Sequence, residues 1–233
     1  MAAPKLIVAE PNGVVRGVAL VLHGGRSRGH RPVRATQLTV LRMRPFAASL
    51  RRHGGPDGLV VAQLRYRVRG WNGADRSPVA DAECGLAALA TRFPDVPVAI
   101  VGHSMGGRTA MYVAGHERVR AVVGLAPWIE AGDPVDPLTA RRVLIAHGDR
   151  DRTTDPRASA AYAQSAESVA ESVSYVNVSG DGHGMVRRAP IWHELSTGFV
   201  RGVLFGTRPD GTDDSEPANV LTRALAGHAA LVV

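Results

Sequence analysis

Short runs of apolar residues recur along the chain and alternate with stretches in which apolar residues repeat every three or four positions. Runs of four to six apolar residues are typical of buried strands, and the longer repeat is typical of amphipathic helices. The predicted strands cover residues 6–9, 14–22, 59–64, 98–101, 121–125, 143–146 and 173–178. The predicted helices lie around Phe46 to Leu50, over 77–93, 105–115 and 156–170, and in a segment that ends near 205. This alternation predicts an α/β domain whose mostly parallel sheet carries helices on both faces.

The two ends of the chain carry patterns of their own. Asn12-Gly13 separates two apolar stretches and is typical of a tight turn, so we expect an N-terminal β-hairpin formed by residues 6–9 and 14–22. Residues 207–218 are polar, acidic and rich in glycine and proline, which predicts a flexible linker. Residues 220–233 then resemble a short helix. The expected organisation is a domain over residues 1–206 and an acidic linker with a short C-terminal helix or tail over 207–233.

The uneven distribution of charge raises the question of a nucleic-acid partner. The chain has 28 basic and 21 acidic residues, and the net charge of +11 in residues 1–120 contrasts with −4 in the rest. Such asymmetry can indicate nucleic-acid binding, but no run of five to eight lysines and arginines is present and aromatic residues make up only 5%. We therefore interpret the charge as a solvated basic surface, with no nucleic-acid partner.

Composition also excludes several other classes of protein. Cys84 is the only cysteine, which excludes an internal disulfide and a multi-cysteine metal site. No apolar run approaches the roughly 18 residues that a membrane span needs. The N-terminal residues lack the basic and apolar regions of a signal peptide, so we expect a cytoplasmic protein without a membrane partner.

The segment Gly102-His103-Ser104-Met105-Gly106 matches the G-x-S-x-G motif of a nucleophile elbow. A predicted buried strand precedes it and a helix-compatible segment follows, which is the strand–turn–helix context that the motif requires. Ser104 is therefore the candidate nucleophile. The N–H group of Met105, at the start of the helix, is suited to stabilise a developing oxyanion.

Two further loops follow predicted strands and carry the residues that would complete a catalytic triad. The first, HGDRDR, begins at His147 and contains Asp149 and Asp151, and the second, SGDGHG, contains His183. Catalytic groups gather at the carboxyl ends of strands in open α/β sheets. His183 is thus the candidate base. Asp155 precedes Pro156 and is better explained as a helix N-cap.

These segments together resemble the α/β-hydrolase family: LVLHGG, GHSMGG, HGDRDRTTDP and GDGHG match its landmarks in order over residues 6–205. The resemblance implies that Asp151 is the triad acid, because members typically read H-G-x-x-D, with Asp149 as the alternative. It implies structural roles for the motif histidines at positions 23, 103 and 147. It also implies that the second oxyanion N–H belongs to Gly25, or failing that to Arg26.

The resemblance also bears on the substrate. About 17 residues separate the strands 121–125 and 143–146, where lidded members insert a cap, so no large cap domain is expected. Capless relatives include dienelactone-hydrolase-like enzymes, small serine esterases and cutinase-like enzymes. The nucleophile of dienelactone hydrolases proper is a cysteine, whereas this chain has Ser104. Ala126-Pro127-Trp128 resembles the wall of the acyl site in the polyester-cleaving group, which suggests that Trp128 contacts substrate.

Arginines in the loops after two central strands raise the expectation of an anionic substrate, since guanidinium groups recognise carboxylate and phosphate. They are Arg26, Arg28, Arg65, Arg67 and Arg69, and a location in solvent explains them equally well. The expected function is a serine hydrolase that needs neither cofactor nor metal and cleaves a small ester or thioester through an acyl-enzyme. The alternatives are an acyltransferase or thioesterase with the same triad, and a non-catalytic ligand-binding module.

Overall fold

A single eight-stranded sheet organises the computed structural model, which describes residues 3–209 and 215–233. The strand order is β1-β3-β2-β4-β5-β6-β7-β8, and every neighbouring pair is parallel except β1 with β3. The strands are β1 (Lys5–Ala9), β2 (Gly17–Leu22), β3 (Leu59–Arg65), β4 (Val98–His103), β5 (Val119–Leu125), β6 (Arg142–Gly148), β7 (Ser172–Val178) and β8 (Ala230–Val232).

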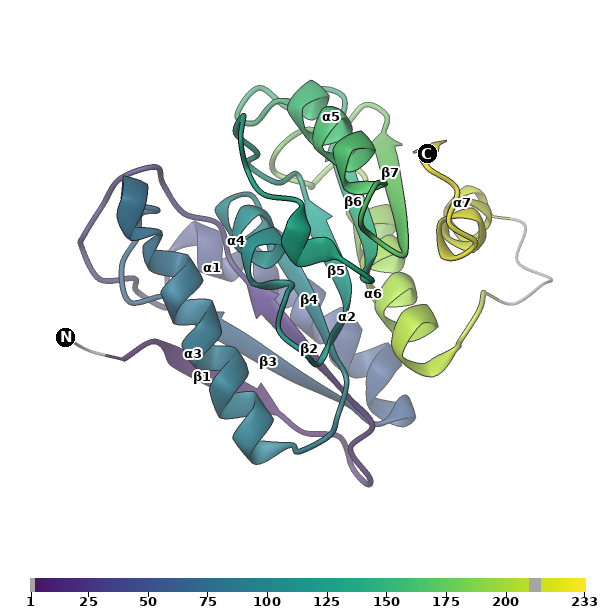
Figure 1. The fold of residues 1–233 in the computed structure, drawn as a ribbon. Coiled ribbons are helices and arrows are strands. Elements are labelled where there is room, and N and C mark those ends of the chain that lie inside the picture. Colours follow the sequence, from purple (N-terminus) through teal and green to yellow (C-terminus); the bar gives the residue numbers. More distant parts are fainter. Residues whose placement is uncertain (1–2, 210–214) are drawn as a thin grey trace.

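Helices cover both faces of this sheet (Figure 1). In the view of Figure 1, α3 (Ser77–Arg92), α4 (Met105–Val113) and α5 (Pro156–Ala166) lie in front of the sheet. Behind it lie α2 (Met43–Gly54) and α6 (Ala189–Phe205), with the short α1 (Leu38–Leu41) before α2 and α7 (Glu216–Leu225) packed on α6. The predicted α/β architecture is confirmed.

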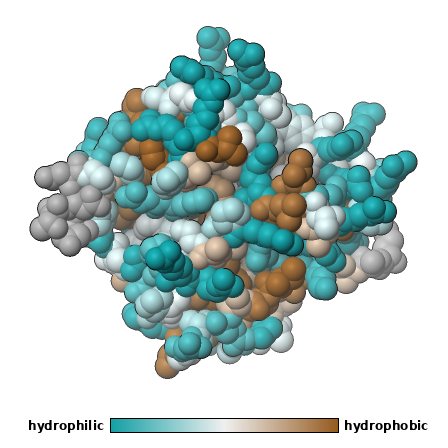
Figure 2. Space-filling model, turned by 180° about the vertical axis from the view of Figure 1, so that it is seen from behind, coloured by the Kyte–Doolittle hydropathy of each residue, from teal (hydrophilic) through white to brown (hydrophobic). Residues whose placement is uncertain are grey.

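The central strands are apolar on both sides because each side faces a helical layer. In β2, Val18, Leu20 and Leu22 pack into the cluster that includes residues of α3, α4 and α5, whereas Ala19 and Val21 pack with α2 and α6. Side chains of a strand alternate between the two faces, so a strand buried on both faces has no polar positions. Viewed from behind, the surface shows its hydrophobic residues in small patches between hydrophilic ones (Figure 2).

The N-terminal antiparallel pairing that the sequence indicates is present, but the partner of β1 is β3 and not β2, which follows β1 directly. A two-residue type I′ turn needs positive φ at both central residues. Only Gly13 of the Asn12-Gly13 pair has it, at 120°. The connection therefore opens into a wider loop, and β2 enters the sheet on the far side of β3, where it can pair with both β3 and β4.

The C-terminal segment packs on the domain rather than extending from it. Its helix α7 begins earlier than expected, where the Ser215 side chain accepts a hydrogen bond from Ala218 N–H, and it ends at Leu225, before Gly227 at φ 84°. The chain then forms β8, parallel to β7, so the expected helix over 220–233 is replaced in part by a strand. Part of the expected linker, residues 210–214, lies outside the described residues. The domain boundary at residue 206 stays a prediction.

The strand order creates a crevice at the carboxyl end of the sheet. From β2 the chain crosses to β3 on one side, whereas from β4 it crosses to β5 on the other, so the connections leaving the neighbouring strands β2 and β4 diverge between them. Ligands bind at such switch points in open α/β sheets. Among the described residues, no helix has the length and apolar character needed to cross a membrane.

Candidate active site

The elbow between β4 and α4 holds Ser104 in a strained conformation, with φ 55° and ψ −119°. Close backbone contacts explain why motif positions 102 and 106 are both glycine. A Cβ at Gly102 would lie 2.1 Å from the carbonyl oxygen of Gly106, and a Cβ at Gly106 would lie 2.5 Å from that of Leu22. Only glycine permits this approach of β2, β4 and α4. The turn therefore presents Ser104 at the crevice, at the start of a helix.

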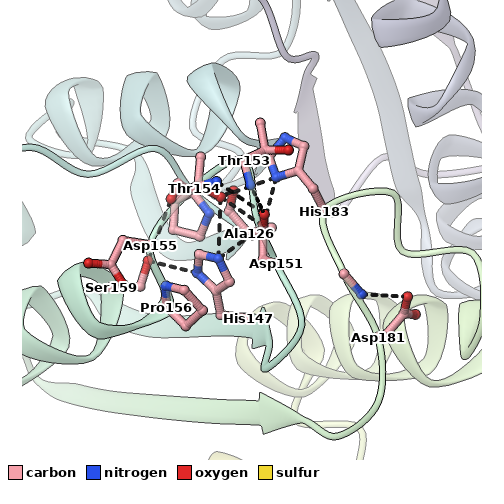
Figure 3. Close-up of polar contacts among 12 residues, drawn as sticks. Ala126, His147, Asp151, Thr153, Thr154, Asp155, Pro156, Ser159, Asp181 and His183 are labelled. Carbon is pink, nitrogen blue, oxygen red and sulfur yellow. Dashed lines mark hydrogen bonds and ion pairs between the residues drawn. The ribbon is translucent and has the colours of Figure 1, made fainter.

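His183 and Asp151 are brought together from two different loops, as Figure 3 shows. His183 Nδ1 lies 2.8 Å from Asp151 Oδ2, and the Asp151 side chain is fully buried whereas that of His183 is 16% exposed. A carboxylate only accepts hydrogen bonds, so Nδ1 carries the proton and Nε2 is left as the basic nitrogen. No hydrogen bond joins the Ser104 hydroxyl to His183 in the described residues; such contacts commonly tighten when substrate binds.

The environment of Asp151 keeps it ionised. Burial by itself would raise its pKa, but hydrogen bonds from His147 and His183 and from the N–H groups of Thr153 and Thr154 outweigh burial and hold the pKa well below the usual range. Asp149, the alternative acid, instead accepts a hydrogen bond from Gly180 N–H at 2.7 Å. The structure thus pairs Asp151 with His183 and uses Asp149 to join the two loops.

A second histidine also contacts Asp151. His147 Nε2 lies 3.1 Å from Asp151 Oδ2, and His147 Nδ1 lies 2.8 Å from Ser159 Oγ (Figure 3). Ser159, His147 and Asp151 repeat the residue types of a triad, but Ser159 and His147 are completely buried and no substrate can reach them. The buried His147 therefore supports Asp151 through this hydrogen bond, which is the contact behind the structural role expected for His147.

Thr154 is a contact that the sequence reasoning missed. Its hydroxyl donates to Asp151 Oδ2 at 2.8 Å and lies 3.1 Å from His183 Nδ1. The only signal in the sequence is its place three residues after Asp151, where a backbone turn returns the side chain to the carboxylate. Asp155, one residue further, accepts from Arg157 N–H and caps α5 as predicted.

Two backbone N–H groups are available beside Ser104. Met105 is the first residue of α4, so its N–H has no partner within the helix. None of the hydrogen bonds of the described residues uses Gly25 N–H, whereas Arg26 N–H donates to Arg69 O at 2.9 Å. A Cβ at Gly25 would lie 2.3 Å from Met105 Cε. The geometry therefore favours Gly25 over Arg26 as the second donor.

Two other motif histidines are neutral packing groups. His103 stacks on His183 with ring centroids 4.7 Å apart, and its Nε2 donates to the His183 carbonyl oxygen at 3.0 Å. Burial lowers the pKa of His103 to about 3. Burial likewise lowers the pKa of His23 to about 4, and its Nδ1 donates to Gly24 O at 2.7 Å. Both therefore fix the backbone beside the site without adding charge to it.

Asp181 anchors the loop that carries His183. Its buried carboxylate accepts hydrogen bonds from Gly182 N–H at 2.8 Å, Arg188 N–H at 3.0 Å and Trp192 Nε1 at 3.0 Å. Burial would raise the pKa of Asp181, but these hydrogen bonds outweigh it and lower the pKa. The loop is thereby fastened to α6.

Replacing Asp181 with asparagine is expected to lower the free energy of unfolding at pH 7 by about 2 kcal/mol, because hydrogen bonds to a charged group are lost. The pKa is lower in the folded than in the unfolded state, so the contribution is present above about pH 4 and disappears as pH falls through the folded pKa. Urea unfolding of both proteins between pH 7 and pH 3 measures this. A stability difference that does not shrink with falling pH would contradict the role of the charge.

The expected substrate residues lie in separate depressions on this side of the sheet. Arg26 is exposed and lines a cavity of about 320 Å³ together with Gly24 and Gly25. Trp128 follows β5, and its N–H donates to Ser104 O at 3.1 Å, so its loop lies beside the nucleophile. Of the other arginines, Arg67 is paired with Asp81, which removes it as a free cation.

Comparisons with known proteins bear on the family and the fold of the chain. The family model described as serine aminopeptidase, S33, matches residues 15–143, more than half of the chain. The comparison with curated proteins found no match.

Three solved structures illustrate the likeness in fold. An alpha-beta serine hydrolase homologue from Coxiella burnetii is 19% identical, with a TM-score of 0.62 over 83% of this chain and 90% of that one. Est1E from Butyrivibrio proteoclasticus with bound ferulic acid is 15% identical, with a TM-score of 0.64 over 86% and 95%. XC6422 from Xanthomonas campestris, a serine hydrolase without lid, is 17% identical, with a TM-score of 0.63 over 88% and 91%.

Proposed function

The chain belongs to the serine aminopeptidase S33 family of α/β hydrolases, and from this premise we propose that it cleaves carboxylic ester or thioester bonds through an acyl-enzyme. Ser104 Oγ attacks the carbonyl carbon while His183 Nε2 takes its proton, and the tetrahedral intermediate then collapses to the acyl-enzyme as the imidazolium gives this proton to the leaving alcohol or thiol. Asp151 holds the tautomer of His183 and stabilises the imidazolium that forms. The N–H groups of Gly25 and Met105 stabilise the oxyanion. Water then releases the acyl group, with His183 again acting as base.

This proposal rests on one observation: His183 is hydrogen-bonded to Asp151 at the same end of the sheet as the strained Ser104 elbow. Within the described part of the chain, the basic Nε2 of the partly exposed His183 has no hydrogen-bond partner. At the same carboxyl end of the sheet, the hydrogen bonds of the described residues use neither Gly25 N–H nor Met105 N–H. The connection from β5 to β6 contains only the short 3₁₀ turn η3 (Asp136–Leu138), which supports a site without a cap. The ferulic acid bound to Est1E and the missing lid of XC6422 fit an open esterase site.

A fluorophosphonate probe is expected to label the wild-type protein covalently, because the probe reacts with an activated serine. Ser104→Ala should abolish labelling, whereas Ser159→Ala, which removes the buried serine behind His147, should retain it. Gel fluorescence and intact mass measure both. Labelling that persists in Ser104→Ala would reject the assigned nucleophile, and a wild-type protein that stays unlabelled would favour a ligand-binding module. Hydrolysis of 4-nitrophenyl esters of graded acyl length then measures the size of the acyl site.

A further inference from the structure

A depression of about 410 Å³ lies between the loops that follow β2, β3 and β5, beside α4, which begins directly after Ser104. Its aromatic residues come from distant parts of the sequence: Trp71 follows β3, Tyr112 belongs to α4 and Trp128 follows β5. The ring centroids of Trp71 lie 5.1 Å from those of Tyr112 and 6.1 Å from those of Trp128, in edge-to-face contact. Trp128 N–H bonds to Ser104 O, so one residue of this lining contacts the backbone of the candidate nucleophile.

A buried arginine organises these rings. The guanidinium carbon of Arg108 lies 4.3 Å from the ring centroid of Trp71 and 4.6 Å from that of Trp128, so the cation contacts both indoles where the two rings meet edge to face. Arg108 also binds Asp133 at 2.7 Å and Glu130 at 2.8 Å. Two carboxylates thus neutralise its charge, and we infer that it supports the aromatic residues. Its buried Nη1 has no hydrogen-bond partner in the described residues.

Two exposed arginines, Arg28 and Arg76, complete the lining. Neither forms an ion pair within the part of the chain that the structure describes, and the guanidinium carbon of Arg76 lies 5.1 Å from the ring centroid of Tyr112. Glu130, the acid in the lining among the described residues, is bound to Arg108. The depression therefore combines aromatic surface with two cations that have no carboxylate partner.

The backbone of one of these two arginines, Arg76, is strained. Arg76 has φ 42° and ψ 45°, a left-handed conformation in which a side chain is strained and glycine is not. The loop is fixed because Trp71 N–H donates to Arg26 O at 2.9 Å and Asn72 N–H donates to Ser27 O at 3.0 Å. Strain of this kind that persists in a rigid loop is common at functional sites.

We propose that this depression binds an anionic end, carboxylate or phosphate, of a substrate whose flat or apolar part lies on the partly exposed rings of Tyr112 and Trp128. The proposal rests on the proposed function, since it names the substrate class of the same site. Of the five arginines that the sequence suggested for binding an anionic substrate, Arg28 lines this depression. Arg76, which the sequence did not single out, lines it as well. Guanidinium groups bind either anion, and the adjacent indoles favour a ring next to it.

Tryptophan fluorescence tests binding independently of catalysis, because two of the three tryptophans line the depression and Trp192 is fully buried elsewhere. Titration at low salt with benzoate and with phenyl phosphate is expected to give a saturable change, and benzyl alcohol is expected to give none. Arg76→Gly should weaken anion binding about fivefold to tenfold while relieving backbone strain, so that its Tm does not fall. Arg28→Gln should act in the same direction. Arg34→Gly removes an exposed arginine outside the depression and should leave binding unchanged.

The tighter of the two ligands identifies the anion. The same ligands should competitively inhibit hydrolysis of a neutral 4-nitrophenyl ester by the wild-type protein. Equal affinities in wild type and Arg76→Gly, or binding without competition, would overturn the proposal. If the protein cleaves no ester, the proposed function fails, and the fluorescence titration still decides whether the depression binds anions.

Discussion

Replacing Asp151 with asparagine is expected to lower kcat for ester hydrolysis about 10,000-fold. The asparagine amide can donate to His183 Nδ1, which would move the proton to Nε2 and remove the base. The loss should be large because Asp151 Oδ2 also accepts from His147 and Thr154, so that the neutral side chain cannot satisfy all three partners. Steady-state kinetics with a 4-nitrophenyl ester measures the effect.

Asp149→Asn is the matched control, two residues away in the same loop. It removes a carboxylate that bonds to Gly180 N–H and does not contact His183, so kcat should stay within about threefold of wild type. Circular dichroism checks that both variants are folded. If Asp149→Asn were the more damaging change, Asp149 would be the functional acid despite its position.

Gly106→Ala is expected to lower the free energy of unfolding by about 3 kcal/mol or more, and Tm by about 6–12 °C. Its Cβ would lie 2.5 Å from Leu22 O and 2.7 Å from His23 O, and backbone atoms of a central strand cannot move aside as a flexible side chain can. Thermal unfolding followed by circular dichroism provides the measurement.

Gly115→Ala serves as the comparison for the glycine substitution. The nearest atom to its added Cβ is 3.7 Å away, an ordinary contact, so the free energy of unfolding should change by less than about 0.5 kcal/mol. Equal destabilisation by the two substitutions would mean that the close approach of β2 to α4 is not what requires glycine at position 106.

The sequence was sufficient where a residue's role is local. Gly102 and Gly106 flank Ser104 because of contacts within one turn and its neighbouring strand, and the surrounding apolar runs locate that turn on the sheet. The parallel strands were likewise predictable, since burial on both faces leaves a continuous apolar run. The positions of the candidate acid and histidine after β6 and β7 follow from the same edge of the sheet.

Roles that depend on contacts between distant segments were not predictable. Both edges of β2 are occupied, by β3 and β4, so β1 pairs with the free edge of β3. The Asn12-Gly13 turn contains no signal for this choice of partner. In the sequence Arg108 is an ordinary helix residue, and only folding brings Trp71 and Trp128 into contact with its guanidinium group. The strain at Arg76 is a property of φ, which a residue's identity does not reveal unless it is glycine or proline.

The carbonyl group of Ser104 accepts two hydrogen bonds, from Arg108 N–H within α4 and from Trp128 N–H in the loop after β5, both at 3.1 Å. The peptide group that follows Ser104 is therefore held to the loop that contains Trp128. A displacement of the Trp128 backbone either breaks this hydrogen bond or carries the Ser104 peptide with it. We therefore expect the thermal motion of that loop to be coupled to that of Ser104 through this one hydrogen bond.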